Sequence, residues 1–273
     1  MTVTQLFGKY YISGKSVNGK CRDHNEDRIL INCQAGLMLV ADGMGGHLHG
    51  ERASSEAIAL INRLFETQLP LIEKKWDIRF LWRKLLAIFT LGSLTHELAY
   101  QRQTIRKILI ETNKALYAIN RKEAFLDGTG MGTTLVGCRF FENPPRMLVF
   151  HVGDSRLYRL RNKQLLPVTK DHSLYQLWLD SGQIGKKPGS NVILQGLGPD
   201  AQIIPEVQLL KVLPGDAFLL CSDGLNDMLS DDSMEDIMHN LSAATIDATL
   251  DQLIDAANDS GGSDNISAIL ICQ

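Results

Sequence analysis

The stretch GLMLVADG at residues 36–43 decides the fold, because it joins a short apolar run directly to an aspartate and a glycine. Three other stretches share this arrangement: RMLVFHVGDS at 146–155, DAFLLCSDG at 216–224 and GGSDNISAILIC at 261–272. Apolar runs rich in β-branched and aromatic residues and punctuated by glycine are typical of strands. The aspartate closes the first three runs and opens the last. The sequence therefore predicts four strands, each with a carboxylate at one end.

Segments with helical periodicity lie between these strands. Apolar residues recur in them at three-to-four spacing, with serine or aspartate available near the predicted N-termini. Residues 28–42 read instead as two strands joined by a short turn at 34–36. Close strand pairs combined with long helices favour largely antiparallel sheets with helices packed outside them. The helix-like segments are 50–66, 104–122, 172–182 and 232–260, the last expected to contain two helices.

Length and composition limit the class of protein. The 273 residues suit one large or two small domains, and 44% hydrophobic with 22% charged residues is the globular average. Because no repeat and no linker rich in proline, glycine or serine appears, we expect a single domain over residues 1–273. Residues 67–103 are the least strand-like region and are interpreted as a helical insertion or a cover helix.

Charge and cysteine content exclude several functions. A net charge of −3 argues against a nucleic-acid partner, which usually meets a strongly basic domain. No signal peptide is recognisable, and the apolar stretch at 85–94 is 10 residues long, half of what a bilayer requires. Five cysteines without a C-x-x-C spacing suggest neither a disulfide framework nor a zinc site. We therefore expect a cytoplasmic protein without a membrane partner.

The candidate functional residues are carboxylates beside the predicted strand ends. Each lies next to a glycine or a small polar residue, so that it can approach a shared ligand. Like charges that converge are costly, and proton uptake or a bound cation is the usual compensation. Ligands made only of oxygen favour Mg²⁺ or Mn²⁺, and two such ions bridged by one aspartate would generate a hydroxide nucleophile and hold a phosphoryl oxygen. These carboxylates are Glu26, Asp27, Asp42, Asp154, Asp223 and Asp264.

Rival motifs are incomplete. Residues 14–21 nearly spell a phosphate-binding P-loop, but Cys21 stands where serine or threonine should hold Mg²⁺. His47 and His49 form an H-x-H that no further histidine motif supports. No cysteine is followed by arginine at the sixth position, and no G-x-S-x-G elbow occurs. Covalent catalysis is therefore disfavoured.

Seven motifs follow one another between about Gly14 and Cys272: RDHNED, ADGMGGHLHGERAS, GMGTTLVG, HVGDSRLYRL, TKDHSLYQLWLDSGQI, CSDGLNDML and GGSDNISAILI. Taken in order, they resemble those of the metal-dependent Ser/Thr protein phosphatases of the PPM type, which are protein phosphatase 2C-like, in their bacterial form. The resemblance implies an α+β fold: a four-layer α-β-β-α sandwich in which helices flank two mainly antiparallel sheets, with a metal cleft at one end.

The resemblance also implies roles for individual residues. Asp42 would bridge two metal ions, with the Gly43 carbonyl on one of them. Asp223 and Asp264 would complete the pair of sites. Arg22 would grip the substrate phosphate, a role that suits the planar guanidinium fork.

Further carboxylates take secondary roles in the same scheme. Glu26 and Asp27 would act mainly through metal-bound waters. Asp154, together with Asp223 and Asp227, would form a third, weaker metal position.

Three regions beside the implied site are assigned less directly. Met44 stands where eukaryotic members have a histidine, which leaves the proton donor open between a metal-bound water and His24. Residues 169–198 correspond to a flap beside the cleft, rich in glycine, that would gate or select substrates; an ordinary surface loop is the alternative. Thr133 and Thr134 are expected to start a strand across the sheet from the site.

The activity that the resemblance implies is hydrolysis of phosphoserine and phosphothreonine in proteins by a metal-bridging hydroxide, with two Mn²⁺ or Mg²⁺ ions and room for a third. The expected partners are phosphorylated proteins, as targets of a Ser/Thr kinase, and the kinase itself; the expected state is a monomer. Two alternatives stay open: a pseudophosphatase that only holds a phosphorylated partner, and a phosphatase for small phosphate esters.

Overall fold

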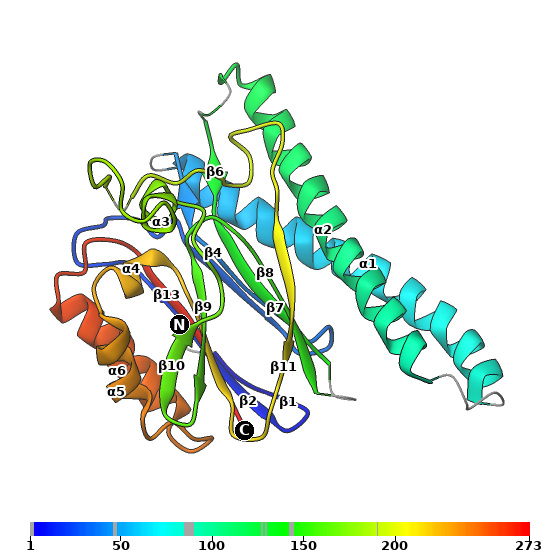
Figure 1. Cartoon of the computed structure of the whole chain (residues 1–273). Helices are drawn as coiled ribbons and strands as arrows, with labels where there is room; N and C mark the ends of the chain where they lie inside the picture. The colour runs from blue at the N-terminus through cyan, green and yellow to red at the C-terminus, as the bar shows by residue number, and fades with distance from the viewer. Residues whose placement is uncertain are drawn as a thin grey trace.

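Two antiparallel sheets packed face to face form the centre of the molecule (Figure 1). The computed structural model describes residues 3–45, 48–84, 90–126, 128, 130–141, 145–189 and 191–273, so His47 lies outside the described residues. One sheet has six strands in the order β1-β2-β13-β12-β9-β10, and the other has five in the order β11-β8-β7-β4-β3. A short third sheet pairs β5 with β6.

The predicted apolar runs at 28–42, 146–155, 216–224 and 261–272 each contain strands, and further strands lie outside these runs. The six-stranded sheet contains β1 (Val3–Phe7), β2 (Tyr10–Val17), β9 (Arg156–Arg161), β10 (Gln164–Pro167), β12 (Ala217–Cys221) and β13 (Ile266–Cys272). The five-stranded sheet contains β3 (Arg28–Asn32), β4 (Leu37–Ala41), β7 (Leu135–Phe141), β8 (Arg146–Val152) and β11 (Glu206–Lys211). The short pair is β5 (Gly43–Met44) and β6 (Gly132–Thr133).

Helices cover the outer face of each sheet (Figure 1). The long helices α1 (Leu48–Lys84) and α2 (Thr90–Lys122) pack on the five-stranded sheet. The helices α4 (Asp223–Asn226), α5 (Asp231–Met238) and α6 (Ile246–Asp259) pack on the six-stranded sheet. The remaining helix, α3 (Leu174–Asp180), lies within the predicted flap. This arrangement confirms the predicted four-layer α-β-β-α sandwich.

Burial on both faces explains why the strands read as continuous apolar runs rather than as alternating ones. Along β12, Phe218 and Leu220 belong to the core between the two sheets. Leu219 and Cys221 point the other way, into the core beneath α5 and α6. An antiparallel sheet with one solvated face would place polar residues at every second position. Here each sheet separates two apolar cores, so both sets of positions are apolar.

Each predicted helical segment contains a helix, and the segment 172–182 contains α3. The predicted segments 50–66 and 104–122 carry the residues of α1 and α2 that contact the five-stranded sheet, including Ala57, Phe65 and Ile108. Both helices extend further, because the apolar periodicity marks only the packed portion of a helix. The segment 232–260 forms two helices, as predicted.

Residues 67–103 form the far parts of α1 and α2, apart from 85–89, which lie outside the described residues. In Figure 1 these far parts extend beyond the edge of the sheets. No helix in the described part of the chain combines the length and the apolar character that crossing a bilayer demands.

The core between the sheets supplies a stability test. Leu220 is fully buried there, whereas Leu166 on β10 is 43% exposed. We expect Leu220→Ala to lower the free energy of unfolding by about 2–5 kcal/mol, because it leaves a cavity that close-packed neighbours cannot fill. The matched control Leu166→Ala should change it by less than about 0.5 kcal/mol. Urea unfolding followed by circular dichroism measures both; equal losses would contradict this account of the core.

Candidate active site

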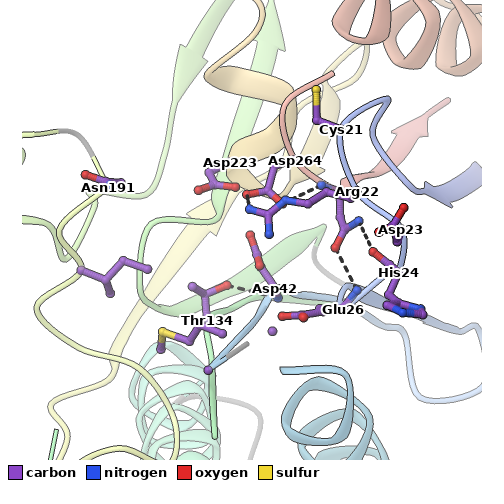
Figure 2. A pocket seen from close by; sticks show the side chains of 15 residues that line it. Cys21, Arg22, Asp23, His24, Glu26, Asp42, Thr134, Asn191, Asp223 and Asp264 are labelled. Atoms are coloured by element: carbon purple, nitrogen blue, oxygen red, sulfur yellow. Dashed lines mark hydrogen bonds and ion pairs between the residues drawn. The ribbon is translucent and has the colours of Figure 1, made fainter. Parts of the chain in front are cut away.

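The predicted carboxylates converge because of strand direction. Both β4 and β8 pair antiparallel with β7, so β4 and β8 run the same way and end at the same edge of the five-stranded sheet. In the other sheet β12 pairs antiparallel with β13, so the end of β12 lies beside the start of β13. Strands far apart in the sequence thus deliver Asp42, Asp223 and Asp264 to one end of the sandwich (Figure 2).

An open cleft of about 580 Å³ lies at this end. Of the residues predicted for the metal and phosphate sites, six line it, and Asp27, Asp154 and Asp227 are not among its lining residues. His24, Met44 and Thr134 also contribute to its wall. The six are Arg22, Glu26, Asp42, Gly43, Asp223 and Asp264.

Two threonines fix the backbone of Asp42. The Asp42 carbonyl accepts hydrogen bonds from the Thr133 hydroxyl and the Thr134 amide, both at 2.8 Å. The Asp42 amide donates to Thr134 Oγ1 at 3.3 Å. The sequence analysis placed both threonines across the sheet from the site, but Thr134 lines the cleft itself. The prediction missed this because it depends on pairing between strands distant in sequence: Gly43 pairs with Thr133 and Val40 with Val136, which places Thr134 opposite Asp42.

Glycine is required at two positions where α1 meets the cleft. A β-carbon on Gly43 would lie 2.2 Å from the Gly50 carbonyl oxygen and 2.6 Å from that of Glu26. A β-carbon on Gly50 would lie 2.9 Å from the Gly43 carbonyl carbon. Real side chains do not make such approaches to backbone. The glycines therefore let the start of α1 close against the segment that carries Glu26.

Arg22 reaches the cleft from the turn after β2. Its Nη2 donates to the Asp264 carboxylate at 2.8 Å, and its Nε donates to the Ser263 carbonyl at 3.3 Å. The turn approaches β13 closely, because a β-carbon on Gly19 would lie only 1.9 Å from the Asp264 carbonyl oxygen. The glycine of the P-loop-like stretch 14–21 thus serves backbone packing.

Asn265 is a positioning residue that the sequence analysis missed. Its side-chain Nδ2 donates to the His24 carbonyl at 2.8 Å, and its Oδ1 accepts from the Glu26 amide at 2.9 Å. One buried amide therefore ties the Glu26 segment to the start of β13. The sequence feature that could have identified Asn265 is its position directly after Asp264, in the run SDN that opens a strand.

Asp27 lies behind the cleft in a buried polar network. Its Oδ2 accepts from the Ser222 hydroxyl at 2.8 Å, and that hydroxyl accepts from the Ser267 amide at 3.0 Å. Its Oδ1 is buried without a hydrogen-bond partner. Burial raises the pKa of Asp27 to about 7, and Asp223 and Asp264 add to the increase.

Asp154 and Asp227 form a second group beside Asp223. Asp154 follows β8, is buried, and has one carboxylate oxygen without a partner. Burial raises the pKa of Asp154 to about 7, and the charge of Asp223 is the next largest cause. Asp227 caps the C-terminus of α4 and is exposed. These two carboxylates are therefore coupled to the cleft through Asp223 rather than being part of its wall.

The two central carboxylates cannot both carry a full charge at low cost. Burial raises the pKa of Asp42 well above its ordinary value, and the charges of Asp27 and Asp223 raise it further. Burial also raises the pKa of Asp223 to about 6, even though interaction with the Asp42 carboxyl lowers it. The Oδ1 atom of Asp223 is buried without a partner. Unpartnered buried oxygens among crowded carboxylates fit a hard divalent cation.

A second cluster of ligand-type atoms serves the flap instead. His151, His172 and Glu206 place three such atoms within 4.8 Å of one another. The Lys170 carbonyl lies 2.8 Å from His151 Nε2, so that nitrogen carries the proton. The Gly153 amide donates to His172 Nδ1 at 3.2 Å, which puts the His172 proton on Nε2, the atom 3.8 Å from Glu206. No lone pair is then left on that atom for a metal, and the cluster anchors the base of the flap.

The raised pKa of Asp27 gives a pH prediction for protein kept in a strong chelator. Folded Asp27 holds its proton up to about pH 7, whereas the unfolded residue releases it near 3.8. The stability that this carboxyl contributes is complete below pH 3.8 and is lost as the pH rises towards 7. Asp27→Asn stays neutral and keeps an acceptor for Ser222. The melting temperature of the variant should therefore rise relative to wild type between pH 5 and pH 8.

The difference between the two proteins cancels the titrating groups that do not interact with Asp27, and it contains Asp27 together with its effect on the pKa of Asp42. Thermal melts followed by circular dichroism at both pH values measure it. A difference that stays constant with pH would show that Asp27 titrates normally in the folded protein.

Comparison with known proteins gives the family. Residues 17–270 match the family model for protein phosphatase 2C. The serine/threonine phosphatase stp of Listeria monocytogenes is 33% identical over 263 residues, which cover 93% of this chain and 92% of that protein.

Solved structures agree with this match. The Pseudomonas aeruginosa protein PppA, described as a key regulatory component of T6SS, has a TM-score of 0.74 and 29% identity over 99% of both chains. The catalytic domain of the serine/threonine protein phosphatase PstP, solved in complex with two manganese ions, has a TM-score of 0.71 and 30% identity, covering 96% of this chain and 97% of that one. The chain therefore belongs to the protein phosphatase 2C family.

Proposed function

We propose that this protein hydrolyses phosphoserine and phosphothreonine in proteins, with Mn²⁺ or Mg²⁺ held by the carboxylates of the cleft. One observation carries the proposal: Asp42, Asp223 and Asp264 line one open cleft, and Arg22 lies at its wall. The named relatives support it, since stp and PstP are serine/threonine phosphatases and PstP was solved with two manganese ions.

The residues present fit a two-ion site. Asp42, the Gly43 carbonyl, Asp223 and Asp264 supply only oxygen atoms, the donors that Mn²⁺ and Mg²⁺ prefer. Glu26 is close enough to the same space to act through water. When bound, such ions lower the pKa of water and neutralise charge on a phosphoryl oxygen.

A third ion would use the group beside Asp223. Asp154 offers a buried oxygen without a partner, and Asp227 begins the turn after α4. Asp27 does not line the cleft, but it accepts a hydrogen bond from Ser222 and feels the charges of Asp223 and Asp264. We propose Asp154, Asp223 and Asp227 as the ligands of this weaker position and a water-mediated role for Asp27.

Arg22 is proposed to bind the substrate phosphate. Its Nε and Nη2 contact Ser263 and Asp264, and in the described part of the chain no acceptor bonds to Nη1. The guanidinium thus keeps donors for an incoming phosphate while Asp264 holds its position. A planar fork with several donors matches the oxygen geometry of phosphate better than a lysine does.

The proton donor to the leaving hydroxyl is open between water and His24, which lines the cleft. Met44, also in the wall, cannot supply a proton. The complete carboxylate set favours an enzyme over a pseudophosphatase. The relatives named as protein phosphatases favour protein substrates over small phosphate esters.

The finer expectations about context belong to the same proposal. We propose that the substrates are targets of a Ser/Thr kinase, with the kinase among them, and that the chain acts as a cytoplasmic monomer. We also propose that residues 1–273 are one phosphatase domain, with a helical insertion at 67–103 and a flap at 169–198.

Removing either central carboxylate should abolish catalysis. Asp42→Asn and Asp223→Asn keep the shape of the side chain but remove the charge that holds a cation. We expect each to lower kcat/KM on a phosphothreonine peptide by more than about 100-fold with Mn²⁺ present, and excess chelator to have the same effect on wild type. Phosphate release measures the rate, and circular dichroism checks folding. Full activity of folded Asp42→Asn, or activity that survives chelation, would refute the proposal.

Arg22→Lys tests the phosphate role separately. The variant keeps the positive charge but loses the fork, so KM for the phosphopeptide should rise about 5- to 20-fold while kcat falls less. Arg52→Lys is a matched control, because Arg52 pairs with Glu123 and does not line the cleft. Steady-state kinetics of both variants decide the matter; a loss confined to kcat would remove Arg22 from substrate binding.

A further inference from the structure

The helix of the flap is apolar, but none of its side chains is fully buried, and two of its leucines, Leu174 and Leu177, are exposed. Of the seven residues of α3, five are large and apolar or aromatic, in the sequence LYQLWLD. None of the seven is buried. A surface helix of a globular protein normally hides its apolar side chains against a core, and one that does not presents them to a partner.

Neighbouring residues of the flap extend this apolar area. In the described part of the chain, 12 large hydrophobic side chains are exposed, and five of these fall within residues 174–194. Scattered exposed residues need no explanation, but a local concentration marks an interaction site. The five, called here the flap surface, are Leu174 (36% exposed), Leu177 (55%), Ile184 (77%), Val192 (41%) and Leu194 (46%).

Backbone hydrogen bonds make much of the flap surface continuous. The Leu174 amide donates to the Val192 carbonyl at 2.8 Å, and the Leu194 amide donates to the His172 carbonyl at 2.7 Å. Leu174 and Leu177 are three residues apart on α3, so they share one side of the helix. The helix and the returning strand segment 191–194 therefore present their leucines and valine side by side.

The same segment lines the cleft. Asn191 and Ile193 are part of the cleft wall, and Figure 2 shows Asn191 on the side of the cleft away from Arg22. Ser173 pairs with Ile193 in a β-bridge, so the segment is extended there. Alternate residues of an extended chain point to opposite sides. Val192 and Leu194 consequently lie on the outer side of the cleft rim, next to the residues that form its wall.

The flap surface is held in a fixed place relative to Asp42. At one end of the flap, Arg156 forms a two-pronged ion pair with Asp171 at 2.8 and 2.7 Å. At the other end, Leu197 exchanges two backbone hydrogen bonds with Thr133, whose hydroxyl donates to the Asp42 carbonyl. Such anchoring reduces the ordering cost of binding.

Two lysines give the flap a charge preference. Lys170 is neutralised by Asp180 at 2.7 Å, whereas Lys186 and Lys187 form no ion pair with the described residues. Lys187 Nζ lies 5.2 Å from the centre of the Tyr175 ring, at α3 itself. A cationic border beside an apolar area favours a partner that is both apolar and acidic.

We propose that the flap surface binds an apolar side chain of the phosphoprotein substrate, close in sequence to the phosphorylated residue, with an acidic residue beside Lys186 and Lys187. The proposal rests on the proposed function. The flap surface is continuous with the cleft wall, so a phosphoprotein whose phosphate enters the cleft must pass over this rim. For this reason the substrate, rather than a second copy of this chain, is proposed as the partner that binds there.

The test uses the full chain and the double variant Leu174→Ser/Leu177→Ser. Both positions are exposed, so the fold should be retained, and Leu166→Ser on β10 is the matched control. Two phosphothreonine peptides are compared. One has leucine and glutamate near the phosphothreonine, and the other has serine and glutamine at the same positions. p-Nitrophenyl phosphate, which cannot reach the flap surface, reports the cleft alone.

We expect wild type and Leu166→Ser to prefer the leucine and glutamate peptide by about 5- to 10-fold in kcat/KM, chiefly through KM. The double variant should lose this preference and hydrolyse p-nitrophenyl phosphate at the wild-type rate. No preference in wild type, or an unchanged preference in the double variant, would overturn the proposal. A dimer in light scattering that the double variant abolishes, without a change in peptide preference, would assign the surface to a second copy and overturn it as well.

Failure of the proposed function would look different. If folded wild type with Mn²⁺ hydrolyses neither peptide nor p-nitrophenyl phosphate, the phosphatase assignment fails. Calorimetric titration with the two peptides then tests the flap surface alone, and equal affinities for both would overturn the proposal about binding too.

Discussion

Repulsion among carboxylates at one end of the sandwich is the constraint on which the rest of the site depends. Asp42 and Asp223 line the same cleft, and burial together with neighbouring charges raises the pKa of both. Such an arrangement disfavours the charged state unless protons or cations compensate. A fold can tolerate it only if the backbone beneath is stable enough to hold the groups together. The three apolar cores, which bury both faces of each sheet, provide that stability.

The polar residues around the cleft follow from the same constraint. Because repulsion would push the carboxylates apart, each carrier segment is tied to another by hydrogen bonds. Thr134 holds the backbone of Asp42, and Asn265 joins the Glu26 segment to the start of β13. Ser222 links Asp27 to the end of β12. The site is therefore rigid before any cation binds, which lowers the cost of organising ligands around one.

The sequence predicted the structural features that depend on local residue patterns. Apolar runs that end in aspartate identified the strands of the cleft, and the paired helices in 232–260 were visible from their periodicity. Which carboxylates share the cleft wall was harder, because this depends on strand pairing between distant segments. Asp42, Asp223 and Asp264 line the wall, whereas Asp154 lies behind it although its sequence context is similar. Asn265 and the exposed face of α3 were missed, since a lone amide or a short apolar helix looks the same in sequence whether or not it has a core to pack on.

The net charge of the whole chain does not show how the charge of the cleft changes when cations bind. The chain as a whole carries −3, but its acids are concentrated at one end, where a phosphate dianion would meet carboxylates. Two divalent cations would change the net charge from −3 to +1, and the whole change would fall in the cleft. The Arg22 guanidinium pairs with the Asp264 carboxylate at 2.8 Å and offsets part of this acidic charge. Substrate binding should therefore follow cation binding, because only the loaded cleft offers a phosphate a positive surface.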